Sequence, residues 1–264
     1  MFLHTERLNL ISENDDLKSS SVAIFGVPFD STETNIPGQR FAPNAIRDAF
    51  LAKETGNLTD KIYDAGNIVC VSGNTKNTLK RLEETIKDLF QYTKTAIPIL
   101  LGGEHTVSLG AVVALKEKHP DLQVVSFDAH FDLKENYQEE KLSHSTVMRR
   151  IAELGIPVTI IGARAGSKEE YDFSKNINTN IKNVDFTKPT YISIDMDVFD
   201  PAYAPGVGDP EACGMAPKDV LNILEKKINL AGADIVEANP MIEKHITCSL
   251  AATLLITILE KIRV

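Results

Sequence analysis

Residues 124–132 read Val-Val-Ser-Phe-Asp-Ala-His-Phe-Asp, an apolar run that becomes strongly polar at one residue, Asp128. The run 124–127 is short, contains two valines and is apolar on both faces, which is typical of a parallel strand covered by helices. Ligand sites in open parallel sheets form beyond the carboxyl ends of the strands. This stretch therefore predicts a buried strand that ends at a functional cluster.

The same alternation extends outward from this stretch in both directions. Further buried strands are predicted at residues 22–27, 97–101, 158–161, 191–194 and 233–236. Between them, Leu79, Leu82 and Ile86 repeat at helical spacing. Other helices are predicted at residues 106–119, 217–228 (with Pro217 in the first turn) and 247–262. Alternating strands and helices predict an α/β fold, a three-layer α/β/α sandwich with a mainly parallel sheet. No linker interrupts the pattern, so we expect a single domain over residues 1–264.

The composition narrows the classes of partner. The formal net charge of −9 gives nucleic acid or an anionic membrane no basic surface, so we expect neither as a partner. Cys70, Cys213 and Cys248 are far apart and form no CxxC pair, which favours a reducing, cytoplasmic location.

No targeting or membrane segment is predicted. The first residues lack the basic and apolar regions of a secretory signal. The apolar run 250–259 falls well short of the roughly 20 residues that a membrane span needs, so it is interpreted as part of a buried terminal helix.

Polar residues collect at the ends of four predicted strands. Strand 97–101 leads to Glu104 and His105, strand 191–194 leads to Asp195 and Asp197, and strand 233–236 leads to Glu237. Alternate residues of an extended chain point the same way, so Asp128, His130 and Asp132 can face one pocket, as can Asp195 and Asp197.

Four aspartates in one pocket would repel one another unless cations neutralise them. One divalent ion leaves two negative charges, whereas two ions balance all four. Carboxylates and imidazoles without a thiolate suit manganese, magnesium less well and calcium poorly, while zinc, nickel and cobalt stay open. A lone Asp-x-Asp is usually a turn or a cap, and a lone histidine is usually structural. Their combination favours a two-metal site at His105, Asp128, His130, Asp132, Asp195 and Asp197.

These motifs resemble those of a known family. The stretches GGEHT (102–106), DAHFD (128–132), SIDMDVFDPAYAPGVG (193–208) and VEANP (236–240), with GVPFD and PGQRFAPNAIR between residues 26 and 47, closely resemble the ureohydrolases, the family of arginase and agmatinase. The resemblance covers nearly the whole chain. It implies the arginase-type fold, two Mn²⁺ ions, release of urea and assembly into homo-oligomers, trimers or hexamers.

The resemblance also implies residue roles. One manganese would be held by His105, Asp128, Asp132 and Asp195, and the other by His130, Asp128, Asp195 and Asp197, so that Asp128 and Asp195 bridge. Glu237 would pair with the substrate guanidinium, and His144 would bind substrate and shuttle protons.

Two positions depart from the family pattern. Ser145 replaces the usual glycine after His144, which would alter the loop if that position needs positive φ. Ile36 replaces a frequent arginine, and we expect it to affect the pocket rim or oligomer contacts rather than the chemistry.

Charge counting points to a small cationic substrate. Two divalent ions, four aspartates and one hydroxide made from a shared water sum to −1, which favours a guanidinium over a phosphate ester. Glu237 can orient a guanidinium by charge-assisted hydrogen bonds. Asp132 can relay a proton to the leaving amine, with His144 linking to solvent. Glu237 as a surface ion-pair residue and His144 as an ordinary loop histidine are the alternatives.

Residues 133–145 are the basis for predicting the part of the substrate beyond its guanidinium group. This segment lacks the Asn-Thr-Pro and Ser-Gly-Asn stretches by which arginases hold an amino acid. Its Glu135, Glu139 and Glu140 would repel a carboxylate, although a solvated charged loop is the simpler interpretation. Residues 200–208 resemble agmatinases more than arginases. Agmatine, cleaved to putrescine and urea for polyamine synthesis, is therefore favoured over aminopropylagmatine, guanidinobutyrate, guanidinopropionate and arginine, with formimidoylglutamate less favoured.

Two other function classes have less support in the sequence. A different two-metal hydrolase, such as a phosphatase or a deacetylase, has no support in the sequence. A phosphatase would need basic residues near the motifs to bind a phosphate, and no basic cluster accompanies them. A non-catalytic metal-binding relative would be expected to have lost ligands, and all six ligand positions are present.

Overall fold

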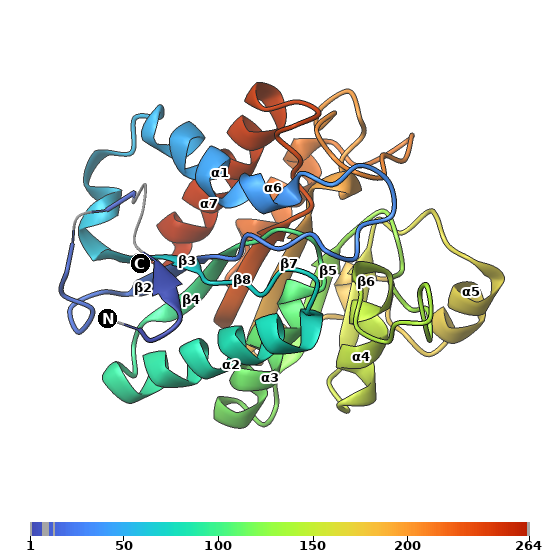
Figure 1. Ribbon diagram of the computed structural model, residues 1–264, viewed down its shortest axis with the longest axis horizontal. Coiled ribbons are helices and arrows are strands. Elements are labelled where there is room, and N and C mark those ends of the chain that lie inside the picture. Colours follow the sequence, from blue (N-terminus) through green and yellow to red (C-terminus); the bar gives the residue numbers. More distant parts are fainter. Residues whose placement is uncertain (1, 7–10, 13, 263–264) are drawn as a thin grey trace.

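A central sheet lies between two layers of helices (Figure 1). The computed structural model describes residues 2–6, 11–12 and 14–262. One face of the sheet carries α1 (Ala42–Leu51), α6 (Pro217–Leu224) and α7 (His245–Ile262). The other carries α2 (Thr75–Tyr92), α3 (Val107–Lys118) and α4 (Val147–Glu153). The predicted three-layer α/β/α sandwich is confirmed. The prediction that no secretory leader is present rests partly on residues 1 and 7–10, which lie outside the described residues.

Within the described residues, eight strands form one sheet in the order β1-β3-β2-β4-β8-β7-β5-β6. Their bounds are β1 (Thr5–Glu6), β2 (Val22–Gly26), β3 (Ile62–Ile68), β4 (Ile97–Leu101), β5 (Gln123–Phe127), β6 (Val158–Ile161), β7 (Thr190–Asp195) and β8 (Leu230–Val236). The β1–β3 pair is antiparallel, and the pairs that link β3 to the remaining strands are parallel. All six predicted strands are present, whereas β1 and β3 were not predicted.

The predicted helices are present with adjusted ends. In α2, Leu79, Leu82 and Ile86 form the buried stripe, and the Asn74 side chain caps the helix by accepting from Asn77 N at 2.9 Å. Pro217 occupies the first turn of α6, but this helix ends at Leu224 rather than 228 because the chain must return to begin β8 at Leu230. The helices α1, α4 and α5 (Lys168–Ser174) were not predicted. Short 3₁₀ segments occur at η1 (Gln39–Phe41), η2 (Gly56–Lys61), η3 (His144–Thr146), η4 (Ile181–Asn183) and η5 (Met196–Val198).

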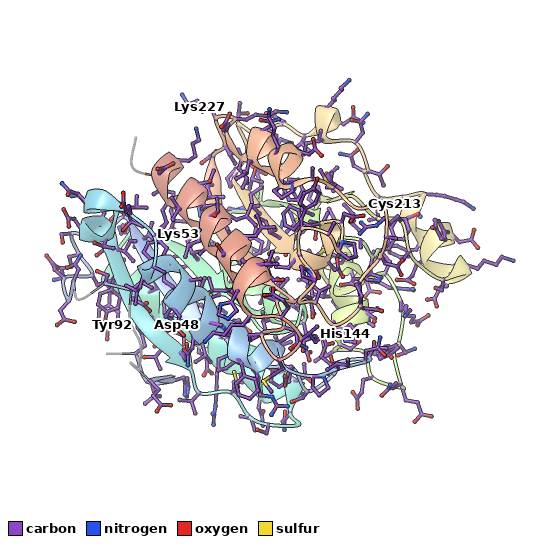
Figure 2. All side chains as sticks on the ribbon, turned by 90° about the horizontal axis from the view of Figure 1, so that it is seen from above. Asp48, Lys53, Tyr92, His144, Cys213 and Lys227 are labelled. Atoms are coloured by element: carbon purple, nitrogen blue, oxygen red, sulfur yellow. The ribbon has the colours of Figure 1, made fainter. Side chains whose placement is uncertain are left out.

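The terminal helix α7 packs against α1 and α6 (Figure 2). By length and composition alone it is apolar enough to cross a membrane, a test that core helices also pass. Its Leu254, Leu255 and Ile258 are buried in the core between the sheet and this helical layer, and Lys53 Nζ donates to Ser249 Oγ at 3.1 Å. The predicted buried terminal helix is therefore found, although it begins two residues earlier, at His245.

The strand order positions the functional residues. Strands β4, β8, β7 and β5 are consecutive neighbours and parallel, so their carboxyl ends meet at one edge of the sheet. The sequence places polar motifs after these same four strands. Residues far apart in the sequence are thus brought together by the topology.

Candidate metal centre and its pocket

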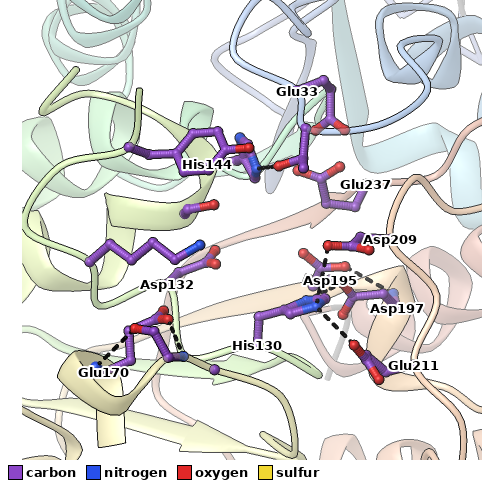
Figure 3. A pocket seen from close by; sticks show the side chains of 16 residues that line it. Glu33, His130, Asp132, His144, Glu170, Asp195, Asp197, Asp209, Glu211 and Glu237 are labelled. Atoms are coloured by element: carbon purple, nitrogen blue, oxygen red, sulfur yellow. Dashed lines mark hydrogen bonds and ion pairs between the residues drawn. The ribbon is translucent and has the colours of Figure 1, made fainter. Parts of the chain in front are cut away.

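The six predicted metal ligands lie at the carboxyl ends of β4, β5 and β7, of which β4 and β7 are separated by β8 alone. His105 is in the turn after β4, and Asp128 directly follows β5. Asp195 is the last residue of β7, and Asp197 lies in the 3₁₀ turn after it. Glu237 follows the fourth strand, β8, and faces the same pocket (Figure 3).

Carboxylate oxygens surround one nitrogen of His105. The atom His105 Nδ1 lies 3.2 Å from Asp128 Oδ2, 3.1 Å from Asp132 Oδ2 and 3.3 Å from Asp195 Oδ2. All of these side chains are buried. Three carboxylate oxygens thus lie within 3.3 Å of one imidazole nitrogen, and His105, Asp128 and Asp132 form a group that could hold a metal ion.

A second group adjoins the first and shares Asp128 with it. His130 Nδ1 lies 2.8 Å from Asp197 Oδ2 and 3.8 Å from Asp128 Oδ1. In each group, three potential ligand atoms lie within 4.8 Å of one another. Two adjacent cation positions with Asp128 between them are thus compatible with the side chains.

The hydrogen bonds behind His105 orient its ring for a cation. Ser193 Oγ donates to Asp234 Oδ1 at 2.6 Å, which uses the only proton of that hydroxyl. The 2.8 Å contact between Ser193 Oγ and His105 Nε2 is therefore a hydrogen bond from Nε2–H, and a neutral ring presents its lone pair at Nδ1. Among the described residues, His105 Nδ1 and Asp128 Oδ2 are buried without a hydrogen-bond partner. The donor set fits a divalent metal ion.

The electrostatics of the cluster also favour a bound cation. Burial, together with Asp132 and Asp197, raises the pKa of Asp128 to about 7. Burial, Asp197 and Asp128 raise the pKa of Asp195 well above its ordinary value. Burial opposes a charge on His130, yet Asp197 and Asp128 raise the pKa of its ring to about 11. The crowded carboxylates thus demand positive charge, which divalent ions can supply in place of protons.

The ligands open onto a cavity of about 260 Å³ (Figure 3). Its wall is acidic, and Lys134 is the one lysine or arginine among the described lining residues. The lining residues are Glu33, Thr34, His130, Asp132, Lys134, Tyr137, His144, Ser145, Gly166, Ser167, Glu170, Asp195, Asp197, Asp209, Glu211 and Glu237. Such a wall favours a cationic ligand.

Two glutamates face each other at one side of this cavity (Figure 3). Glu237 Oε1 accepts from His105 N at 2.5 Å, which ties the carboxyl group to the metal-ligand loop. Burial, Glu33 and Asp195 raise the pKa of Glu237 well above its ordinary range. Burial raises the pKa of Glu33 to about 8, with a contribution from Glu104, although contact with Glu237 opposes it. A bound guanidinium would relieve this repulsion.

His144 lies at the cavity, across from Glu237 (Figure 3). Burial lowers the pKa of its ring, so the imidazole is neutral near pH 7 and able to accept a proton. Ser145 is not among the described non-glycine residues with positive φ, so serine replaces glycine there without backbone strain. Ile36 is exposed and does not line the cavity, consistent with the expected minor chemical role.

Positive φ occurs instead at two site residues. Asp132 has a φ of 52° and Glu237 a φ of 63°, values that non-glycine residues rarely adopt. Both side chains are aimed into the pocket (Figure 3). Strained backbone of this kind concentrates at functional sites, where the surrounding structure holds it in place.

The cavity contains the predicted His144 and several residues that were not predicted. Residues 133–145 contribute Lys134, Tyr137, His144 and Ser145, whereas the three glutamates of this segment are exposed and do not line the cavity, as the solvated-loop interpretation states. Glu33, Asp209 and Glu211 were missed. Glu33 lies between the motif stretches GVPFD and PGQRFAPNAIR, and the other two directly follow residues 200–208, so proximity to the motifs was the available signal.

Comparison with known proteins identifies the family. The model of the arginase family matches residues 20–188 and 175–260. An agmatinase from Bacillus cereus is 36% identical over 270 residues, covering 92% of each chain. The chain belongs to the arginase family. An N(1)-aminopropylagmatine ureohydrolase from Thermococcus kodakarensis, 39% identical, is similar over 89% of each chain.

A solved structure extends the comparison to the fold of this arginase-family chain. The agmatine ureohydrolase of Thermoplasma volcanium matches with a TM-score of 0.87 and 31% identity, covering 99% of this chain and 96% of that one. The predicted ureohydrolase family and arginase-type fold are confirmed. The comparisons also support the predicted hydrolase acting on guanidino compounds.

Proposed function

We propose that this chain hydrolyses agmatine to putrescine and urea, with two Mn²⁺ ions held by the six residues of the candidate centre. One observation carries the proposal: four of the six candidate ligands, His130, Asp132, Asp195 and Asp197, line one cavity with the carboxyl group of Glu237. The similarity to agmatinases supports the substrate, and the hard oxygen and imidazole donors support manganese.

The ligand roles are those that the family resemblance implies. His105, Asp128, Asp132 and Asp195 would hold the first ion, and His130, Asp128, Asp195 and Asp197 would hold the second, so that Asp128 and Asp195 would be shared. When bound, such a pair of ions lowers the pKa of a shared water and makes it nucleophilic near neutral pH. The shared position of Asp128 supports this assignment.

The protein side chains bind and orient the substrate. Glu237 accepts two hydrogen bonds from the guanidinium, which places the guanidinium carbon over the ligand cluster. Glu33, on the same side of the cavity, adds a second carboxyl group that favours a cation. His144 and Asp132 move the proton that the leaving amine needs.

The acidic wall supports a cationic tail. Asp209 and Glu211 line the cavity and lie 3.7 Å and 3.9 Å from His130 Nε2 (Figure 3). Carboxylates there favour the ammonium group of agmatine, and they also suit the longer polycation aminopropylagmatine, the substrate named for the Thermococcus kodakarensis relative.

Lys134 favours a second candidate. Its ammonium group lies 4.8 Å from the centre of the Tyr137 ring within the cavity wall, where it could pair with the carboxylate of a guanidino acid such as guanidinobutyrate. We place this candidate second because five acidic residues outside the ligand set (Glu33, Glu170, Asp209, Glu211 and Glu237) line the same wall.

The test is a urea-release assay with manganese on agmatine, aminopropylagmatine, guanidinobutyrate and arginine in parallel. Agmatine should give the highest kcat/KM. Preference for guanidinobutyrate that is lost in Lys134→Gln would establish the second candidate. Manganese binding without urea release from any of these compounds would contradict a ureohydrolase function. Asp172→Asn, an exposed change on α5, serves as the matched surface control.

We further propose that the chain is one domain that acts in the cytoplasm in putrescine synthesis as a homo-oligomer, trimer or hexamer. The three free cysteines suit a reducing compartment. Elution at the volume of a 29.0 kDa monomer would refute the oligomer.

A further inference from the structure

Two threonine hydroxyls bracket the His144 ring. Thr34 Oγ1 lies 2.8 Å from Nε2, and Thr32 Oγ1 lies 3.3 Å from Nδ1. The backbone N–H of His144 also donates to Thr32 Oγ1 at 3.2 Å. Both threonines belong to the loop after β2, whereas His144 lies more than a hundred residues later in the sequence, in η3. The tertiary structure therefore fixes this imidazole on both sides.

Behind Thr32 is Glu104, whose side chain is fully buried. Its Oε2 accepts from Thr32 N at 2.7 Å, and its Oε1 accepts from Thr32 Oγ1 at 2.6 Å and from Thr106 Oγ1 at 2.5 Å. Three donors converge on this one carboxyl group. Glu104 immediately precedes His105, so the loop that carries a candidate metal ligand also anchors the contact to His144.

The hydrogen-bond inventory then decides where the proton of His144 resides. A hydroxyl has one proton, and Thr32 gives it to Glu104. Thr32 Oγ1 can therefore only accept from the ring, so a neutral His144 must carry its proton on Nδ1. Its Nε2 then has the lone pair, which faces the hydroxyl of Thr34 in the cavity wall.

We propose that Glu104 and Thr32 are positioning residues that hold His144 as the Nδ1–H tautomer and keep Nε2 as the proton acceptor. The inference rests on the proposed function for its catalytic consequence. Because the tautomer is set before substrate binds, Nε2 is ready to take a proton without reorientation of the ring.

Hydrolysis of a guanidinium requires a group that takes up a proton and later returns it, which a neutral His144 with an unprotonated Nε2 can do. A guanidinium and a water yield urea and an alkylammonium, so hydrolysis neither consumes nor releases protons overall. A proton that Nε2 takes from the attacking water must therefore be returned, and the leaving amine nitrogen takes it as the C–N bond breaks. During the interval Nδ1–H stays bonded to Thr32, whose contact with the Glu104 carboxyl group stabilises the transient imidazolium.

The first test compares two substitutions at one position. Thr32→Val removes the hydroxyl at nearly constant volume, and Thr32→Ser retains it. We expect Thr32→Val to lower kcat for agmatine by about tenfold or more, part of the roughly 10²–10⁴-fold that a positioned acid–base group contributes, with little change in KM. Thr32→Ser should retain most of the rate. Thr85→Val, which removes a buried hydroxyl of α2 bonded to Arg81 O, is the matched control and should leave both constants unchanged.

The second test observes the tautomer directly. In ¹⁵N-histidine-labelled protein, the His144 signals are those that disappear in His144→Asn. Nδ1 should be protonated and Nε2 unprotonated in the wild type and in Thr32→Ser, whereas Thr32→Val and Glu104→Gln should shift the proton toward Nε2. A wild type protonated on Nε2, or a Thr32→Val variant with unchanged shifts and unchanged kcat, would overturn the proposal.

The two tests separate this proposal from the proposed function. Absence of urea release by the wild type would refute the function, while the ¹⁵N shifts would still decide the tautomer. Urea release by an equally active Thr32→Val variant would refute the relay and leave the function intact. Glu104→Gln changes a fully buried group and could prevent folding. In that case the comparison of Thr32→Val with Thr32→Ser decides the proposal.

Discussion

Asp128 is the residue on which both ligand groups depend. Its two carboxylate oxygens face different histidines, Oδ2 toward His105 and Oδ1 toward His130. Aspartate alone among the residues of similar size can give an anionic oxygen to each side. The amide of asparagine keeps the shape, but it removes the charge and offers only one oxygen.

Asp128→Asn should therefore lose bound metal and urea release together, because both ion positions lose a ligand. Metal content by inductively coupled plasma mass spectrometry and the urea assay measure the two effects. The exposed variant Asp172→Asn should retain both. Full activity with two bound ions in Asp128→Asn would refute the shared-ligand assignment.

Glu33 places a second carboxyl group beside Glu237 in the cavity wall. Its Oε1 is buried without a hydrogen-bond partner among the described residues, and its carboxyl group faces Glu237. Glu33→Gln should raise KM for agmatine by about tenfold, the equivalent of one charge-assisted hydrogen bond, with a smaller effect on kcat. Steady-state kinetics measure the effect. An unchanged KM would show that the guanidinium contacts Glu237 alone.

The sequence predicts some of these residues and not others for a physical reason. Asp128, His130 and Asp132 are detectable because they alternate within one short segment that follows a predicted strand. The role of Glu33 depends on its contact with Glu237, and the role of Thr32 depends on its contact with His144. Such contacts depend on how separate loops approach one another, which periodicity does not encode.

At the scale of elements, one buried ion pair joins α1 to β3. Arg47 and Asp64 are both fully buried, with Nε to Oδ2 at 2.9 Å and Nη2 to Oδ1 at 2.8 Å. Arg47 Nη1 also donates to Asn67 Oδ1 at 2.6 Å. The pair fixes where the first helix packs on the sheet.

Arg47→Met should lower the free energy of unfolding by about 3–5 kcal/mol, because it leaves the buried Asp64 without a counter-charge. Urea denaturation with a constant m-value measures the loss. Breaking the exposed Lys175–Asp172 pair with Lys175→Met should cost under about 1 kcal/mol and serves as the control. Equal costs for the two variants would contradict the role of burial.

The same pair explains why β3 was not predicted. Its sequence, IYDAGNI, contains an aspartate, a glycine and an asparagine, which are depleted in strands. Asp64 is tolerated inside the sheet because Arg47 from α1 neutralises it. Among the predicted strands, β8 also contains a buried aspartate, Asp234, which accepts hydrogen bonds from the hydroxyls of Ser108, Tyr191 and Ser193.

At the scale of the whole molecule, the candidate centre links strands that are not joined by short connections. The candidate ligands come from the ends of β4, β5 and β7. Bound ions should therefore stabilise the folded chain as a unit, and they should do so more strongly as the metal concentration rises above the dissociation constant.

Manganese at about 100 times its dissociation constant should add about 2.7 kcal/mol and raise Tm by at least about 5 °C in a chain of this size. Differential scanning calorimetry with and without a chelator measures the shift. Asp128→Asn should show a much smaller shift. An equal shift in that variant would place the stabilising metal elsewhere.

The strand order also has a consequence for how the protein is made. Strand β8 is last in the chain, yet it lies between β4 and β7 near the middle of the sheet. A ribosome releases residues 230–236 only after nearly all of the chain has emerged, and until then the two halves of the sheet have no shared strand. Translation stopped before residue 230 would thus release a chain with two exposed inner strand edges, a substrate for chaperones and proteases rather than a slightly shortened enzyme.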